Sequence, residues 1–106
     1  MANQTTQITC SAFEAGRPIG YSNTTVVNEN GTMKMFLFGN KIAEYVNGKL
    51  HISMCGWGSR TTQERLNGLT GVSLTRKNWE WYLNGQPIST YATYEVVAGQ
   101  PIKEVI

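Results

Sequence analysis

The stretch that decides the fold class runs from a turn through a strand into a helix, and residues 47–71 read NGKLHISMCGWGSRTTQERLNGLTG. Asn47-Gly48 predicts a two-residue hairpin turn, because both residues tolerate the positive φ angles that such turns require. Apolar and polar residues then alternate over residues 49–55, with Leu50 and Ile52 on the same side. This alternation is typical of a strand with one buried face.

A helix is predicted shortly after this strand. Thr61-Thr62-Gln63-Glu64 has the capping-box pattern, with the first threonine as N-cap and the glutamate reaching back to it. Leu66 and Leu69 repeat at helical spacing, and Gly68 or Gly71 can end the helix in the left-handed conformation. A helix this short is unstable alone, so we expect it to pack on a sheet.

Similar turn signals divide the rest of the chain into strands. Asn30-Gly31 and Asn84-Gly85 repeat the hairpin dipeptide, and Gly39-Asn40 is a further turn candidate. Residues 33–38 are apolar on both faces and predict a central strand. Other strands are expected at residues 72–76 and 78–83, with weaker indications at residues 7–13, 24–27, 41–46 and 91–97. The predicted class is α+β, an antiparallel sheet of about five to seven strands with one short helix packed on it.

Length and composition fit one small domain. The chain has 106 residues, near the commonest domain size, so we expect residues 1–106 to form a single domain with a few flexible residues at its start. Only 41% of the residues are apolar, so the core needs the large tryptophans. The predicted core residues are Leu50, Ile52, Leu66, Leu69, Val72, Leu74, Trp79 and Trp81.

Charge and cysteine content argue against several classes of protein. The net charge of +2 is small for a generic nucleic-acid binder. Cys10 and Cys55 lack the second pair that a zinc site needs, and we expect two free thiols. Residues 1–7 do not resemble a signal peptide, and the longest apolar run, residues 35–38, is too short to span a bilayer. We therefore expect a soluble cytoplasmic protein without membrane contact, metal ion or cofactor.

An internal repeat is one interpretation of the sequence, because a shift of 37 residues aligns residues 22–48 with residues 59–85 and superposes their Asn-Gly pairs. Duplication of a two-strand unit would produce this match. The same match arises if separate hairpins each select Asn, Gly and Thr for their turns. Both alternatives stay open at the level of sequence.

Reactive side chains are sparse. His51 is the only histidine, and along a strand it lies about 13 Å from Cys55, at about 3.3 Å per residue, too far for a Cys–His pair. Only Cys10, arriving from elsewhere in the fold, could pair with His51. The chain has no aspartate, which excludes a Ser-His-Asp triad. Gly56-Trp57-Gly58-Ser59 could hold an anion beside Arg60, or could be only a tight turn before the helix cap. We expect no catalytic residue.

Aromatic and basic residues interleave in the second half of the chain. Such a mixture can stack nucleobases or anchor a protein partner. Trp79 and Trp81 also suit the core beneath the helix, whereas Trp57 is flanked by glycines and is the best candidate for an exposed contact. The predicted partner-binding residues are Trp57, Arg60, Arg65, Arg76, Lys77 and Tyr82.

Several short runs resemble a known family. They are residues 39–43 (GNKIA), 56–57 (GW), 61–68 (TTQERLNG), 71–72 (GV) and 81–85 (WYLNG), preceded by residues 13–16 (FEAG) and 23–25 (NTT). Together these runs resemble a family of small proteins of tailed bacteriophages. The resemblance implies a setting, namely a phage accessory protein made inside a bacterium, and no mechanism. Most residues of these runs are expected in helix caps and turns. The runs are therefore more typical of residues that maintain a fold than of an active site.

Three functions follow as hypotheses. The first is a non-enzymatic phage accessory protein that binds a host or phage macromolecule, with host takeover or counter-defence as its purpose. The second is a single-stranded nucleic-acid binder that uses Trp57 and Tyr82 as stacking platforms beside the basic cluster. The third is a small enzyme that uses His51 or a thiol. A homodimer formed through edge strands is compatible with each of them.

Overall fold

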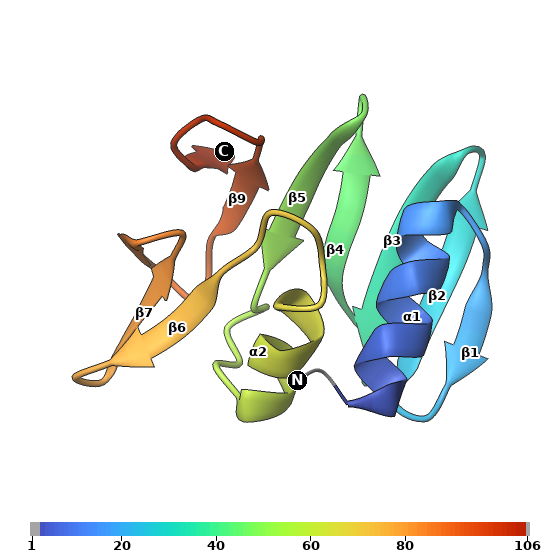
Figure 1. Cartoon of the computed structure of the whole chain (residues 1–106), viewed down its shortest axis with the longest axis horizontal. Coiled ribbons are helices and arrows are strands. Elements are labelled where there is room, and N and C mark those ends of the chain that lie inside the picture. The colour runs from blue at the N-terminus through green and yellow to red at the C-terminus, as the bar shows by residue number, and fades with distance from the viewer. Residues whose placement is uncertain (1–2, 106) are drawn as a thin grey trace.

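The structure is a computed structural model that describes residues 3–105. Within these residues the chain forms two helices and ten strands in two antiparallel sheets (Figure 1). The helices are α1 (Gln4–Ala15) and α2 (Arg60–Leu66). The expected α+β class is confirmed, whereas the expectations of a single helix and of a single sheet are wrong. The predicted flexibility of the first residues concerns residues 1–2, which lie outside the described residues.

The main sheet has seven strands in the order β1-β2-β3-β4-β5-β9-β10. They are β1 (Ile19–Tyr21), β2 (Thr24–Glu29), β3 (Thr32–Leu37), β4 (Asn40–Val46), β5 (Lys49–Ser53), β9 (Thr93–Val96) and β10 (Lys103–Val105). The second sheet contains β6 (Leu74–Lys77), β7 (Glu80–Leu83) and β8 (Gln86–Ile88). Because β5 pairs directly with β9, α2 and the small sheet form an insertion between two neighbouring strands of the main sheet.

The predicted hairpin turns are confirmed where Asn precedes Gly. In Asn30-Gly31, Asn47-Gly48 and Asn84-Gly85 both residues have positive φ, with asparagine values of 51–54°. The turn between β3 and β4 differs by one residue from the expected Gly39-Asn40, since Phe38-Gly39 has the positive φ angles. Phe38 therefore leaves the strand and occupies the first turn position, and this exposes its ring.

Helix α1 replaces the strand predicted at residues 7–13, and that prediction is wrong. The Asn3 side chain caps the helix by accepting from Thr6 N at 2.8 Å, and Gly16 ends it in the left-handed conformation with φ of 76°. Its inward residues recur at helical spacing and are Thr6, Thr9, Cys10, Ala12 and Phe13. Packing of this face outweighs the preference of threonine for strands.

Helix α2 begins two residues earlier than predicted. Ser59 is the N-cap in place of Thr61, and its Oγ accepts from Thr62 N at 3.1 Å. Glu64 does not close a capping box in this arrangement and instead lies 3.3 Å from Arg60 Nε, one turn earlier on the same helix. Residues 56–59 therefore act as a tight turn that leads into a filled helix cap.

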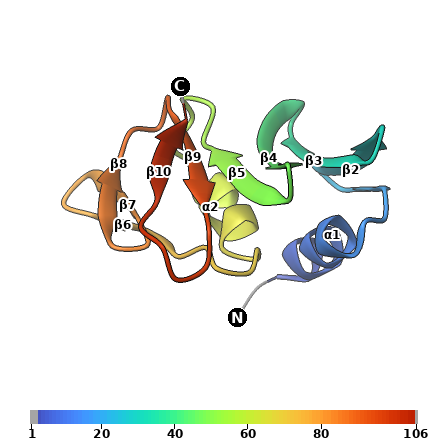
Figure 2. The same cartoon turned by 90° about the horizontal axis from the view of Figure 1, so that it is seen from above.

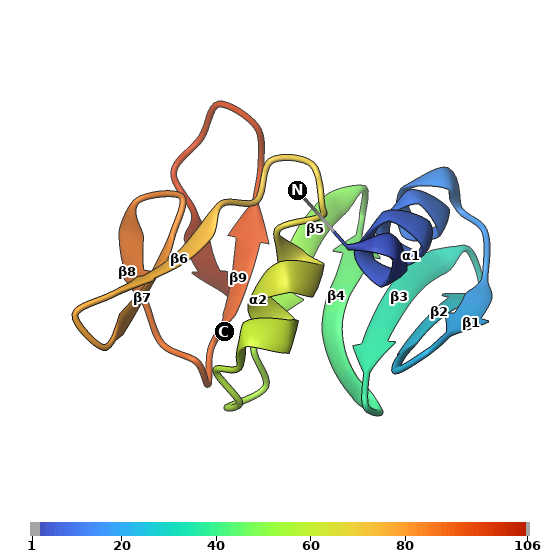
Figure 3. The same ribbon diagram turned by 60° about the horizontal axis from the view of Figure 1, so that its bottom comes forward.

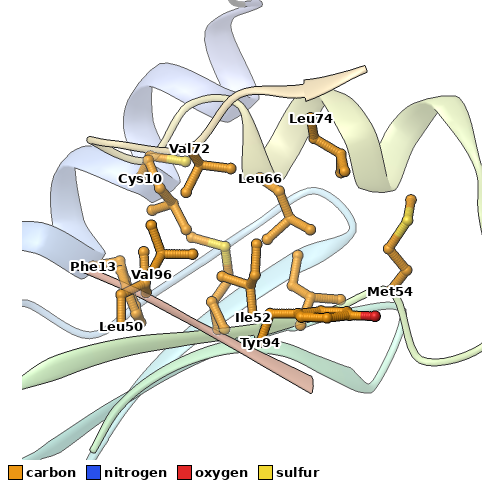
Figure 4. Packing of buried hydrophobic residues seen from close by; sticks show 14 of the residues in the cluster. Cys10, Phe13, Leu50, Ile52, Met54, Leu66, Val72, Leu74, Tyr94 and Val96 are labelled. Carbon is orange, nitrogen blue, oxygen red and sulfur yellow. The ribbon is translucent and has the colours of Figure 1, made fainter. Parts of the chain in front are cut away.

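The core lies between the main sheet and the two helices, as the close view in Figure 4 shows. Seven of the eight predicted core residues are buried, namely Leu50, Ile52, Leu66, Leu69, Val72, Leu74 and Trp81. The exception is Trp79, which is 87% exposed. Asn78 and Trp79 form the β6–β7 turn with φ of 51° and 69°, so the strand alternation that predicts an inward Trp79 stops before this residue.

The two helices cover one face of the main sheet and leave the other face open (Figures 2 and 3). Across the open face, one row of cross-strand neighbours alternates basic and acidic side chains: Lys34, Glu44, His51, Glu95 and Lys103. Such opposite-charge neighbours stabilise a solvated sheet face modestly. Among residues 3–105, no helix has the length and apolar character needed to cross a membrane.

The proposed internal repeat does not fit the structure. Residues 24–29 form strand β2, whereas the residues aligned with them, 61–66, lie in helix α2. The shared Asn47-Gly48 and Asn84-Gly85 turns both connect hairpin strands. The match therefore reflects similar turn requirements at separate hairpins.

Candidate partner-binding surface

Three aromatic side chains lie exposed at one end of the main sheet, and we call Phe38, Trp57 and Tyr91 the aromatic cluster. The end of β3, the end of β5 and the start of β9 meet there, because neighbouring strands are antiparallel. The three side chains are 59%, 55% and 83% exposed, respectively. The rings of Phe38 and Trp57 contact each other, with centroids 6.0 Å apart. The prediction that Trp57 is exposed is confirmed.

The loop after β5 holds Trp57 outward through a sharp backbone turn. Cys55 and Gly56 both have positive φ, at 55° and 74°. Gly56 N donates to Thr90 O at 2.7 Å, which ties this loop to the one that carries Tyr91. A Cβ on Gly56 would lie 2.7 Å from Tyr91 Cε1, so only glycine allows the ring to approach. The loops that carry Trp57 and Tyr91 are therefore fixed to one another.

Cations next to the aromatic cluster already have acidic partners. Arg60 lies three residues after Trp57 and pairs with Glu64 on α2, although its side chain is 89% exposed. Lys41 Nζ lies 2.8 Å from Glu44 Oε1. Surface ion pairs of this kind contribute little to stability, but they reduce the positive charge that this end of the sheet presents.

Arg65 is buried, with 2% of its surface exposed, so the prediction that it contacts a partner is wrong. Its Nε donates to Thr24 Oγ1 at 2.9 Å, its Nη2 donates to Asn23 Oδ1 at 3.1 Å, and its Nη1 donates to Thr6 Oγ1. These acceptors belong to α1, to the β1–β2 turn and to the start of β2. Burial lowers the pKa of Arg65, and the neutral oxygens compensate by accepting its N–H groups. Arg65 is a structural link between three segments.

Arg76, Lys77 and Tyr82 lie on the small sheet but on two faces. Arg76 is the cross-strand neighbour of Trp81 and shares its face, with the guanidinium carbon 5.4 Å from the ring centroid. Lys77 and Tyr82 point to the other face. The Tyr82 hydroxyl donates to Glu80 Oε2 at 3.1 Å, and this carboxylate raises the pKa of Tyr82. The predicted contact residues therefore do not share one surface.

The main sheet separates Cys10 from the other reactive side chains, His51 and Cys55. His51 Nε2 lies 3.1 Å from Glu95 Oε1 on the open face, and this hydrogen bond lowers the pKa of Glu95. His51 and Cys55 line an open hollow of about 240 Å³. Cys10 lies in the core on the covered face, where its Sγ donates to Arg65 O and burial raises its pKa to about 11. Within residues 3–105, no three His, Cys, Asp or Glu side chains gather as a metal site would require.

Phe38, Trp79 and Tyr91 are exposed aromatic residues absent from the predicted contact set. Phe38 was expected in a strand, although the glycine after it signals a turn. Asn78 is a comparable signal for Trp79, since asparagine opens three other hairpin turns. Tyr91 lies in the loop before β9, and its sequence carries no clear indication that the ring is exposed.

The fold and its surface define a small α+β protein whose exposed aromatic residues sit on loops. A model of the family described as Kyanoviridae Gp96 protein matches residues 2–102, and the chain belongs to this family. This confirms the resemblance to tailed-phage proteins at the level of the family. Searches of curated proteins and of solved structures gave no match.

Proposed function

We propose that this protein is a non-enzymatic accessory protein of a tailed phage and binds a host or phage protein in the bacterial cytoplasm. The aromatic cluster of Phe38, Trp57 and Tyr91 is the observation that supports the proposal. Interference with a host process or with host defence is the purpose we propose for this contact.

Exposure of three neighbouring rings is unfavourable for an isolated protein. Each large aromatic side chain covers about 150–250 Å² when it is buried in a contact, so a partner could remove several hundred Å² of apolar surface from water. Tryptophan and tyrosine also dominate the residues that carry binding energy at protein interfaces. Rigid loops strengthen such a contact because little conformational entropy is lost on binding.

The contacts that the reactive side chains already make favour a binding function over catalysis. His51 is held against Glu95 in the row of charges on the open face, and Cys10 is enclosed by the core. Cys55 donates its Sγ–H to Lys41 O at 2.9 Å. A nucleophile and its base must lie within hydrogen-bond reach of each other, and the sheet separates Cys10 from His51.

Single-stranded nucleic acid is the second candidate partner. Exposed rings could stack bases, but the cations predicted to bind phosphates are reduced in number, because Arg65 is buried and Arg60 pairs with Glu64. A nucleic-acid contact would weaken steeply with added salt. A contact centred on aromatic rings would change little with salt, so salt dependence separates the two candidates.

Affinity capture from lysate of infected host cells tests the proposal. The wild-type protein is compared with the Phe38→Ser/Trp57→Ser double variant and with Lys49→Ala, a control at the opposite end of the sheet. We expect a host or phage protein that wild type and control retain and that the double variant loses by about tenfold or more. Equal recovery with all three proteins, at equal melting temperatures, would contradict the proposed surface.

A further inference from the structure

The β6–β7 hairpin carries an arginine that lies over two indole rings. The guanidinium carbon of Arg76 lies 5.4 Å from the ring centroids of both Trp79 and Trp81. We call these three residues the arginine clamp. Cation–π contacts at such distances hold a guanidinium in place. Within residues 3–105, Arg76 has no ion pair or hydrogen-bond acceptor for its side chain, so its N–H groups face solvent.

Trp79 stands at the turn position where three other hairpins of this chain have glycine. Its φ is 69°, and Gly31, Gly48 and Gly85 occupy the same turn position with φ of 78–85°. A bulky residue is strongly disfavoured in this region of backbone conformation. With 87% of its surface exposed, Trp79 gains no core packing that would compensate. Trp79 instead packs its ring against Arg76 and presents the rest of that ring to solvent.

The hairpin lies next to the loop that carries Trp57. A Cβ on Gly58 would lie 2.6 Å from Trp81 Nε1, so the loop that carries Trp57 passes directly over the inner ring of the clamp. A partner that covers Trp57 can therefore reach Arg76 as well. Lys77 follows Arg76 on the same strand and makes no ion pair among the described residues.

We propose that the arginine clamp binds a carboxylate in an acidic segment of the partner protein. The planar guanidinium presents parallel N–H donors that match the two oxygens of a carboxylate, while Trp79 covers the adjoining methylene groups. This inference rests on the proposed function and adds the chemistry of the partner. A protein is favoured over nucleic acid because Arg76 and Lys77 are only two cations, whereas a nucleic-acid contact needs several phosphates neutralised.

NMR observation of the Arg76 side-chain Nε–H group tests this proposal. The full-length protein is titrated with a capped peptide of alternating glutamate and glycine, with the same peptide carrying glutamine, and with oligothymidylate. We expect a saturable shift of the Arg76 signal with the glutamate peptide and a response at least about fivefold weaker with the glutamine peptide. The Trp79 signals should move with it, and oligothymidylate should bind more weakly.

Variants separate recognition from folding. Arg76→Lys keeps the charge but removes the parallel donors, so we expect at least about fivefold weaker binding of the glutamate peptide. Trp79→Gly should keep or raise the melting temperature, because it restores the residue used in the other turns, and should still weaken the peptide complex. Arg17→Lys, on the exposed connection between α1 and β1, is the matched control and should bind as wild type does.

Three results would overturn the inference. One is an Arg76 signal that does not respond to the glutamate peptide, and another is an equal response to the glutamine peptide. The third is tighter binding of oligothymidylate at the same residues, which would assign the clamp to nucleic acid. These failures are distinct from failure of the proposed function, because capture through Phe38 and Trp57 can persist in Arg76→Lys.

Discussion

Thr24 Oγ1 accepts a hydrogen bond from Arg65 Nε at 2.9 Å inside the protein, and this contact joins two segments 41 residues apart in the sequence. Both residues belong to runs that carry the resemblance to phage proteins. Asn67 and Asn84 have similar structural roles, since their side chains bond the backbone of Leu74 and Ser73, respectively. These residues of the signature maintain the scaffold, and the exposed rings are available for binding.

Replacement of Arg65 should destabilise the protein strongly. In Arg65→Ala the oxygens of Thr6, Asn23 and Thr24 lose their donors, and each unsatisfied buried group costs about 1–3 kcal/mol. We expect the free energy of unfolding to fall by at least about 3 kcal/mol in urea denaturation. Arg60→Ala, on the exposed side of the same helix, should cost under about 0.5 kcal/mol. Similar losses in both variants would argue against the structural role of Arg65.

Gly68→Ala should loosen the contact between the two helices. A Cβ at this position would lie 2.3 Å from Thr6 Cγ2 and 2.7 Å from Cys10 Sγ. We expect a loss of about 1–3 kcal/mol from overpacking, measured by thermal or chemical unfolding. Gly20→Ala is a suitable comparison, since a Cβ there would meet no atom within 4 Å. Equal stability of the two variants would show that the helices can separate at no cost.

The two thiols should differ in reactivity by orders of magnitude. Cys10 is 3% exposed and has a pKa of about 11, so about one molecule in a thousand carries its thiolate at pH 8. Cys55 is exposed. Intact-mass analysis after brief treatment with iodoacetamide should show a single adduct in the folded protein, located at Cys55, and two adducts in urea. Rapid labelling of Cys10 in the folded protein would contradict the observed burial.

Glu95 should titrate at lower pH than a free glutamate, because His51 donates a hydrogen bond to its carboxylate. A depressed pKa contributes stability above the unfolded-state value of about 4.5, and this contribution is lost as the pH falls through the folded-state value. Carbon NMR of the Glu95 carboxyl group should therefore give a midpoint below 4.5 in the wild type. In His51→Thr the midpoint should rise, and an unchanged midpoint would rule out this hydrogen bond as the cause.

The local features of the fold could be predicted where backbone chemistry decides them. Asn30-Gly31 and Asn47-Gly48 give their hairpins because few other residues tolerate positive φ. Trp79 shows where such prediction fails. Strand alternation predicts that its ring points inward, but Trp79 lies in a turn together with the adjoining Asn78. Helix α1 is missed because its threonines favour strands, although Asn3 and Gly16 at its ends are recognisable caps.

The surface could be predicted only in part, because burial of a long polar side chain depends on distant segments. Arg65 is normally expected at the surface, and its burial follows from acceptors 41 to 59 residues away. The glycines on both sides of Trp57 predict that its side chain is exposed. Its contact with Phe38 depends on the alignment of β3 with β5 through β4, which local sequence patterns do not determine.

The central claim is that the aromatic cluster, with Phe38 and Trp57 at its centre, contacts another protein. Site-specific photocrosslinking inside infected cells tests it most directly, with benzoylphenylalanine placed at Phe38 and, in a second protein, at Lys49 on the opposite end of the sheet. The account predicts a discrete adduct with a host or phage protein from position 38 and none from position 49. An adduct from position 49 alone, or none from position 38, would contradict it.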